Sequence, residues 1–190
     1  PKREQKAQEL KAAMTALDAA IAREATWAPL QPGWQRVRST LASLADEGLR
    51  LDGPTNFRTH TEAIAGMLRW LGDLGDTSGL ALDPDPASAN LIAPLLNTLP
   101  ELSERLGQLR ARGTNLTARR ALVQADEHAV VSLLAEIGRA ESALIERLQR
   151  TARINSALAD RLDAAGKEIS AGVEQVRTTT RQEILERRFE

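Results

Sequence analysis

The residue types that carry most enzyme and metal chemistry are scarce in this sequence. It contains two histidines, His60 and His128, and no cysteine. No second histidine follows either one at a spacing of four, so the spacing of a helical zinc site is absent. The glycines occur singly, which excludes the common phosphate-binding loops, and no G-x-S-x-G nucleophile motif occurs. We therefore expect no catalytic residue, no metal site and no cofactor, and we predict that the protein is not an enzyme.

Carboxylates gather around one proline-containing stretch, at Asp73, Asp76, Asp83 and Asp85. Oxygen ligands suit a hard cation, but this spacing is not that of an EF-hand. Asp before Pro is also a common way to form a turn, and turn formation and helix capping are the favoured interpretation. Asp76, Ser78, Asp83 and Asp85 remain candidate contacts to a small-molecule ligand.

His60 and Trp70 are the other candidate ligand-binding residues. His60 flanks an apolar stripe on a predicted helix, where it would either contact a ligand inside the bundle or sit at the boundary of the core. The boundary position is favoured. Trp70, together with Trp27 and Trp34, could line a small-molecule pocket, although tryptophans at helical spacing more often pack in a core.

The composition favours helices throughout. Of the 190 residues, 42% are hydrophobic but only 3% are aromatic, and there is no tyrosine. Strong helix formers dominate, whereas sheets favour aromatic and β-branched residues. The net charge of −1, from 25 basic and 26 acidic residues, lacks the basic excess of a nucleic-acid-binding protein. No segment approaches the ~20 apolar residues of a membrane-spanning helix.

The N-terminal part is predicted to form helices separated by proline-containing breaks. The first helix begins near Lys2 and has its apolar residues on one face: Leu10, Met14, Leu17 and Ile21. Pro29 and Pro32 disturb the pattern, so either one helix is kinked there or two helices meet. A turn at 52–54 precedes another helix, which is capped by Thr55 or Asn56 and ends near Asp76.

The C-terminal part is predicted to contain longer helices. After the extended stretch 76–86, a helix begins near Ala87, is kinked or broken at Pro94 and Pro100, and stops at Gly113. The segment 114–190 contains no proline.

Its two lines of apolar residues are best accommodated by a hairpin with its turn at 153–156 and with Asn155 or Ser156 as the new N-cap. Gly138 and Gly166 are weaker candidates for this turn. The expected fold is therefore an all-α, elongated antiparallel bundle of five to six helices with long C-terminal helices, forming a single domain over residues 1–190. The breaks at Pro29–Pro32 and Pro94–Pro100 are candidate hinge or pocket positions.

Part of the sequence resembles a known family. The string F-R-T-H-T at 57–61 is followed by D-T-S-G-L-A-L-D-P-D at 76–85, L-P-E-L at 99–102 and L-G-Q-L-R-A-R-G at 106–113. In this order they resemble the helical extracytoplasmic sensor region of bacterial methyl-accepting chemotaxis proteins and related sensor histidine kinases. That family's D-S-Y-Y-L-M-D pattern is replaced at 86–94 by P-A-S-A-N-L-I-A-P, so both tyrosines are absent.

The resemblance implies a signalling role within a larger membrane receptor at the periplasmic face of the bacterial inner membrane. The implied partners are a small-molecule ligand or a binding protein, a second copy in a homodimer, and the membrane through flanking segments, but no nucleic acid. The alternative function is a non-catalytic helical scaffold or protein-interaction module, which near-heptad leucines and alternating charges suit equally well.

Overall fold

The computed structural model describes residues 2–186, with side chains from residue 4 onward. These residues form helices joined by short turns, and no β-strand occurs among them, which confirms the predicted all-α class. The chain contacts divide into two compact units, with the boundary after Leu82. No helix within 2–186 combines the length and the apolar content needed to cross a bilayer. The grouping of both units into one sensor domain stays a prediction.

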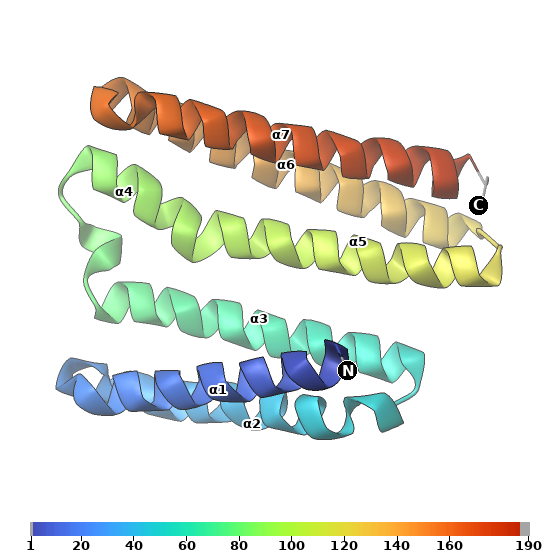
Figure 1. Ribbon diagram of the computed structural model, residues 1–190, viewed down its shortest axis with the longest axis horizontal. Helices are drawn as coiled ribbons and strands as arrows, with labels where there is room; N and C mark the ends of the chain where they lie inside the picture. Colours follow the sequence, from blue (N-terminus) through green and yellow to red (C-terminus); the bar gives the residue numbers. More distant parts are fainter. Residues whose placement is uncertain (1, 187–190) are drawn as a thin grey trace. The chain divides into compact units, whose positions relative to one another are not determined.

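The N-terminal unit contains three α-helices joined by 3-10 segments. In chain order these are α1 (Lys2–Arg23), η1 (Ala25–Leu30), α2 (Gln31–Glu47), η2 (Gly48–Arg50), α3 (Gly53–Thr77) and η3 (Leu80–Leu82). Figure 1 shows that within this unit each α-helix runs back along the preceding one. The two prolines separate α1 from α2, because Pro29 lies inside η1 and Pro32 lies in the first turn of α2, where a proline is tolerated.

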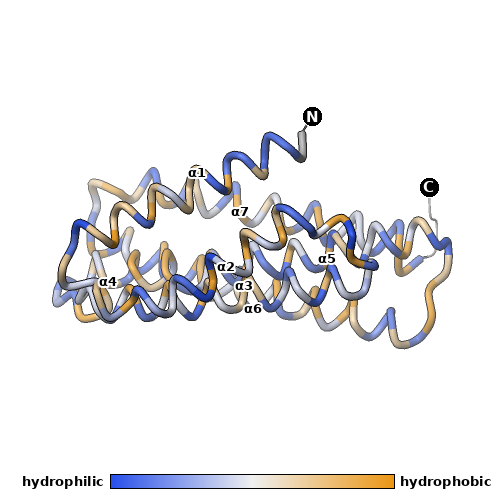
Figure 2. Tube along the Cα trace, turned by 90° about the horizontal axis from the view of Figure 1, so that it is seen from below, coloured by the Kyte–Doolittle hydropathy of each residue, from blue (hydrophilic) through white to orange (hydrophobic). Residues whose placement is uncertain are grey.

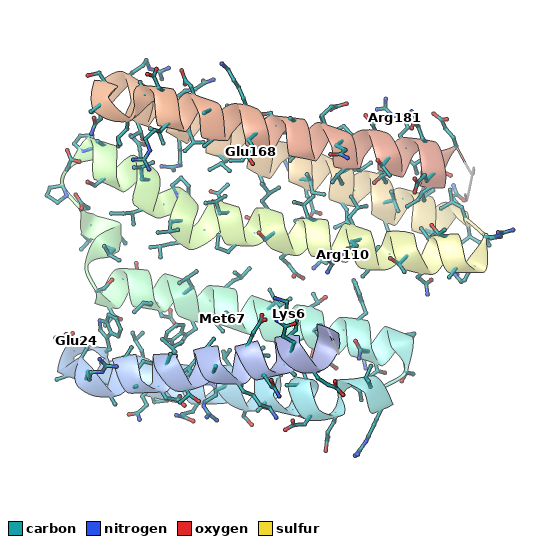
Figure 3. All side chains as sticks on the ribbon, in the orientation of Figure 1. Lys6, Glu24, Met67, Arg110, Glu168 and Arg181 are labelled. Atoms are coloured by element: carbon teal, nitrogen blue, oxygen red, sulfur yellow. The ribbon has the colours of Figure 1, made fainter. Side chains whose placement is uncertain are left out.

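The core of this unit comes from the predicted apolar faces. Its buried members are Met14, Ile21, Leu30, Trp34, Val37 and Trp70. Figure 2 shows polar and apolar positions alternating along the helices, as amphipathic helices require. Met67 of α3, labelled in Figure 3, is half-buried and packs against the same core.

The C-terminal unit is built around its longest helix. Its elements are α4 (Pro86–Ala93), the π-turn η4 (Pro94–Thr98), α5 (Leu99–Arg119), α6 (Gln124–Ile154), η5 (Ser156–Leu158), α7 (Ala159–Thr180) and the π-turn η6 (Arg181–Leu185). Helix α6 packs against α4, α5 and α7. The predicted irregularity at Pro94 is the π-turn, which joins α4 directly to α5. If these two are counted as one interrupted helix, the described chain has six, within the predicted number.

Several predicted boundaries differ from the structure. The cap of α3 is Asp52, whose carboxylate accepts a hydrogen bond from the Thr55 N–H; the prediction of Thr55 or Asn56 was wrong. Gly113 does not end a helix but lies buried within α5. The predicted turn at 153–156 is confirmed, since α6 ends at Ile154. However, Asn155 makes no side-chain capping bond and precedes η5 rather than α7.

One turn lies further along the chain than the helix end predicted at Gly113. Helix α5 ends at Arg119 and Arg120 adopts a left-handed conformation with φ of 47°. An ion pair of 2.8 Å then joins Arg119 to Asp126 at the start of α6. The proline-free run from residue 114 therefore contains two reversals instead of one.

Candidate functional site

An open pocket of about 340 Å³ lies in the N-terminal unit. One side of it comes from η1 and the first turns of α2, and the residues there are Pro29, Leu30, Pro32, Gly33 and Arg36. The helix break predicted at Pro29–Pro32 thus lies at the edge of a pocket. The 3-10 geometry and the two prolines interrupt regular helix packing at this point.

The other side of the pocket is one face of α3 near its C-terminal end. Its residues are Trp70, Asp73, Asp76 and Thr77. Spacings of three and four place these side chains along a single helix face. The regular helix therefore aligns two carboxylates and a hydroxyl beside a buried indole ring.

Trp70 ties the two sides of the pocket together. The residue is 4% exposed, and its indole N–H donates a hydrogen bond of 3.1 Å to the Leu30 carbonyl. Gly33 makes the close approach possible, because a Cβ at that position would lie 3.2 Å from Cδ1 of Trp70. A larger residue at position 33 would force α2 and α3 apart or displace the ring.

A second tryptophan connects this site to α1. The rings of Trp34 and Trp70 pack with centroids 5.4 Å apart at an interplanar angle of 47°, within the range of favourable aromatic contacts. The Trp34 N–H donates to Asp18 of α1 at 2.6 Å, and Arg38 Nε donates to the same carboxylate at 2.8 Å. The hydrogen bond from Trp34, and then those interactions with Arg38, hold the pKa of Asp18 below its ordinary value.

The charged side chains around the pocket do not neutralise one another. Arg36, Asp73 and Asp76 are all exposed. No ion pair within 4.0 Å involves any of the three among the described residues. One positive and two negative groups therefore border the same space with their hydrogen-bonding capacity available to a ligand.

The six ligand contacts predicted from the sequence separate into two sets. Trp70 and Asp76 line the pocket. His60 and Ser78 do not line it, and both interact with nearby backbone. The His60 ring nitrogen Nδ1 lies 2.9 Å from the Asn56 carbonyl, and the Ser78 hydroxyl donates to the Gly75 carbonyl at 3.2 Å.

Asp83 and Asp85 also lie outside the pocket lining, and both organise the start of α4. Asp83 accepts a hydrogen bond of 2.8 Å from the Asp85 N–H. Asp85 caps α4 by accepting from the Ser88 N–H and hydroxyl, each at 2.8 Å. The hydrogen bond from the Ser88 N–H is the main reason why the pKa of Asp85 is lowered. This is the turn and capping role favoured for the acidic stretch.

The pocket lining also includes Arg36, Asp73 and the residues around Pro29 and Pro32. The sequence did not indicate that these residues lie together. Within residues 2–186, no cluster of three or more His, Asp or Glu side chains could hold a metal ion. The pocket presents charged groups that can form hydrogen bonds and the edge of an indole ring, and these are features of a small-molecule binding site.

Comparisons with protein-family models, characterised proteins and solved structures found no match to this chain.

Proposed function

We propose that this chain is the extracytoplasmic sensor and signal-relay domain of a bacterial transmembrane chemoreceptor or sensor kinase. The observation that carries the proposal is the pocket between η1–α2 and α3, where Arg36, Asp73 and Asp76 are unpaired beside the buried Trp70. A ligand that touches both sides would bias the position of α2 relative to α3. Packed helices have discrete alternative arrangements, so a shift of ~1–2 Å can be passed along them.

The contacts behind the pocket supply a route for such a shift. Trp70 packs on Trp34, and Trp34 is hydrogen-bonded to Asp18 of α1. Movement of Trp70 therefore changes the packing between α2 and α1 as well. This chain of contacts joins all three helices of the N-terminal unit.

The receptor proposal also includes context that lies outside the described residues. In this context the domain acts as a homodimer at the periplasmic face of the inner membrane, anchored through flanking membrane segments. Two-fold association is the commonest symmetry of protein oligomers. The near-neutral charge of the chain fits a small-molecule or protein partner better than a nucleic acid.

The direct test is a ligand screen that uses tryptophan fluorescence to follow thermal unfolding. All three tryptophans lie in the N-terminal unit, so their signal reports the unfolding of the unit that contains the pocket. A ligand at ten times its Kd stabilises that unit by about 1.4 kcal/mol. For a unit of this size, this corresponds to an increase in Tm of about 6 °C or more.

Amino acids, organic acids, amines and inorganic anions form the screen. A hit that raises the fluorescence Tm supports direct sensing. The contrary result is that no compound raises the fluorescence Tm while a protein partner binds tightly. It would refute direct sensing and favour the scaffold or interaction module.

A further inference from the structure

We infer that the pocket binds a small zwitterion, with Arg36 holding its anionic group and Asp73 and Asp76 holding its cationic group. The inference rests on the proposed sensing function and adds the chemical class of the ligand. Its basis is the placement of opposite charges on opposite sides of one pocket.

The positive side of the pocket is suited to a carboxylate. The Arg36 guanidinium is exposed and unpaired, and it reaches back along α2, with one terminal nitrogen 3.9 Å from the position that a Cβ on Gly33 would occupy. This places the cation beside Gly33, whose Cα side faces the Trp70 ring. A planar guanidinium can bind a carboxylate through two parallel hydrogen bonds.

The negative side is suited to an ammonium group. Asp73 and Asp76 lie three residues apart on α3, so both carboxylates project from one face of the helix. An ammonium group has three donors and no acceptor, and two carboxylates can accept from it together. Thr77, on the same side, adds a neutral hydroxyl.

A ligand with a single charge fits this arrangement less well. An anion would gain Arg36 but would be repelled by two carboxylates. A simple cation would gain the carboxylates but would face the guanidinium, which also opposes a divalent metal ion. Only a molecule that carries both charges satisfies both sides.

The size and the remaining surface restrict the ligand further. A volume of about 340 Å³ lies near the lower end of the range for small-molecule sites. Pro29, Pro32 and Trp70 contribute apolar surface to the same pocket lining. This surface suits the methylene groups of an α-amino acid or a short ω-amino acid.

The test compares probes that differ only in their charged groups. One matched set is 4-aminobutanoate, butan-1-amine and butanoate, and equivalent sets cover α-amino acids and ω-amino acids of two to six carbons. The whole chain is titrated with each probe while the Tm is followed by tryptophan fluorescence. We expect at least one zwitterion to bind with an affinity at least tenfold higher than that of its matched amine and of its matched carboxylate.

Charge-removing variants then assign the two groups. Arg36→Gln and the double variant Asp73→Asn/Asp76→Asn should each weaken binding of that zwitterion at least tenfold. Arg50→Gln, on η2, and Glu62→Gln, on α3, alter exposed charges outside the pocket lining and should leave the affinity unchanged.

The possible failures are distinguishable. If an amine or a carboxylate binds as tightly as its zwitterion and depends on the same residues, the zwitterion inference is refuted while small-molecule sensing stands. If a zwitterion binds but neither pocket variant weakens it, this pocket is not its site and the inference is also refuted. If no probe in any set binds, the zwitterion inference fails, and direct sensing is decided by the wider screen and the protein-partner test.

Discussion

Gly113 provides a sharp test of the packing within the C-terminal unit. It lies inside α5, where a Cβ would come 3.0 Å from Cδ1 of Ile184 on the π-turn η6. Favourable carbon contacts lie at ~3.5–4.0 Å, so a methyl group there displaces its neighbour. Gly107, on the same helix, has no atom within 4 Å of the corresponding position apart from its chain neighbours and the backbone of its own helix. The two glycines therefore lie in the same helix but differ in the space available for a methyl group.

The magnitudes follow from two opposing effects. Glycine inside a helix is about 0.8–1.0 kcal/mol less favourable than alanine, so Gly107→Ala should raise the free energy of unfolding by about this amount where packing does not interfere. Gly113→Ala has the same helical gain, but overpacking typically costs about 1–3 kcal/mol. We expect Gly113→Ala to change stability by between about 0 and −2 kcal/mol, and to be clearly less stable than Gly107→Ala.

A third substitution tests whether Ile184 is the cause. Ile184→Val removes the Cδ1 atom and by itself costs about 0.5–1.5 kcal/mol. If the contact is the cause, Gly113→Ala becomes stabilising in the Ile184→Val background, with a coupling of about 1 kcal/mol or more.

The assay is urea unfolding followed by circular dichroism at 222 nm. The C-terminal unit contains no tryptophan. Its unfolding is therefore seen as a loss of the circular dichroism signal that has no counterpart in tryptophan fluorescence. Equal stabilisation by Gly107→Ala and Gly113→Ala, or the absence of coupling to Ile184→Val, would refute the packing of η6 on α5.

Three further predictions concern hydrogen bonds that define the two units. Asp18→Asn should lower the Tm at pH 7, because the Asp18 carboxylate accepts from Trp34 and carries a lowered pKa. That stabilisation is present above the ordinary pKa of about 4 and is lost as the pH falls through the lower folded pKa. The Tm difference should therefore shrink between about pH 5 and pH 3; a constant difference would contradict the charge argument. Trp70→Phe removes the bond to the buried Leu30 carbonyl and should cost about 1–3 kcal/mol, measured by urea unfolding; an unchanged midpoint would refute this. Asp85→Ala removes the cap of α4 and should lower the Tm of the C-terminal unit seen by circular dichroism, whereas Asp163→Ala on α7 should not.

Local signals account for much of the fold. The apolar periodicity predicted which helix faces are buried. The prolines predicted the helix breaks at η1 and at the π-turn that begins at Pro94, because a proline lacks a backbone N–H and therefore interrupts a helix wherever it occurs. The turn at Arg120 had no such signal. A left-handed residue is usually Gly or Asn, and here an arginine is held in that conformation between α5 and α6, which pack on one another. Gly113 was misleading as a sign of a helix end, because its lack of a side chain allows the close approach of Ile184 instead.

The candidate site was less accessible to sequence reasoning. Asp83 and Asp85 act on neighbouring residues, so their turn and capping roles could be inferred from local chemistry. The pocket depends on the register between α2 and α3, which brings Gly33 against Trp70. That register is set by packing between residues 37 positions apart. Arg36 and Asp73 therefore came together only in three dimensions, although Trp70 and the Pro29–Pro32 break had been identified separately.

The proposed site divides its residues into those that hold the unit together and those that are free to bind, and the two groups should respond differently to substitution. Asp18, Trp34 and Trp70 form hydrogen bonds and ring contacts within the N-terminal unit, so changing them lowers the Tm. Arg36 and Asp73 are exposed and make no ion pair, and substitutions at such positions usually change stability by less than about 0.5 kcal/mol.

Arg36→Gln should therefore leave the Tm of the ligand-free protein within about 3 °C of the wild type while reducing the stabilisation by a bound zwitterion. Both quantities come from one thermal titration with the tryptophan signal. If Arg36→Gln instead lowered the ligand-free Tm as much as Asp18→Asn does, Arg36 would be part of the packing, and its availability to a ligand would have to be abandoned.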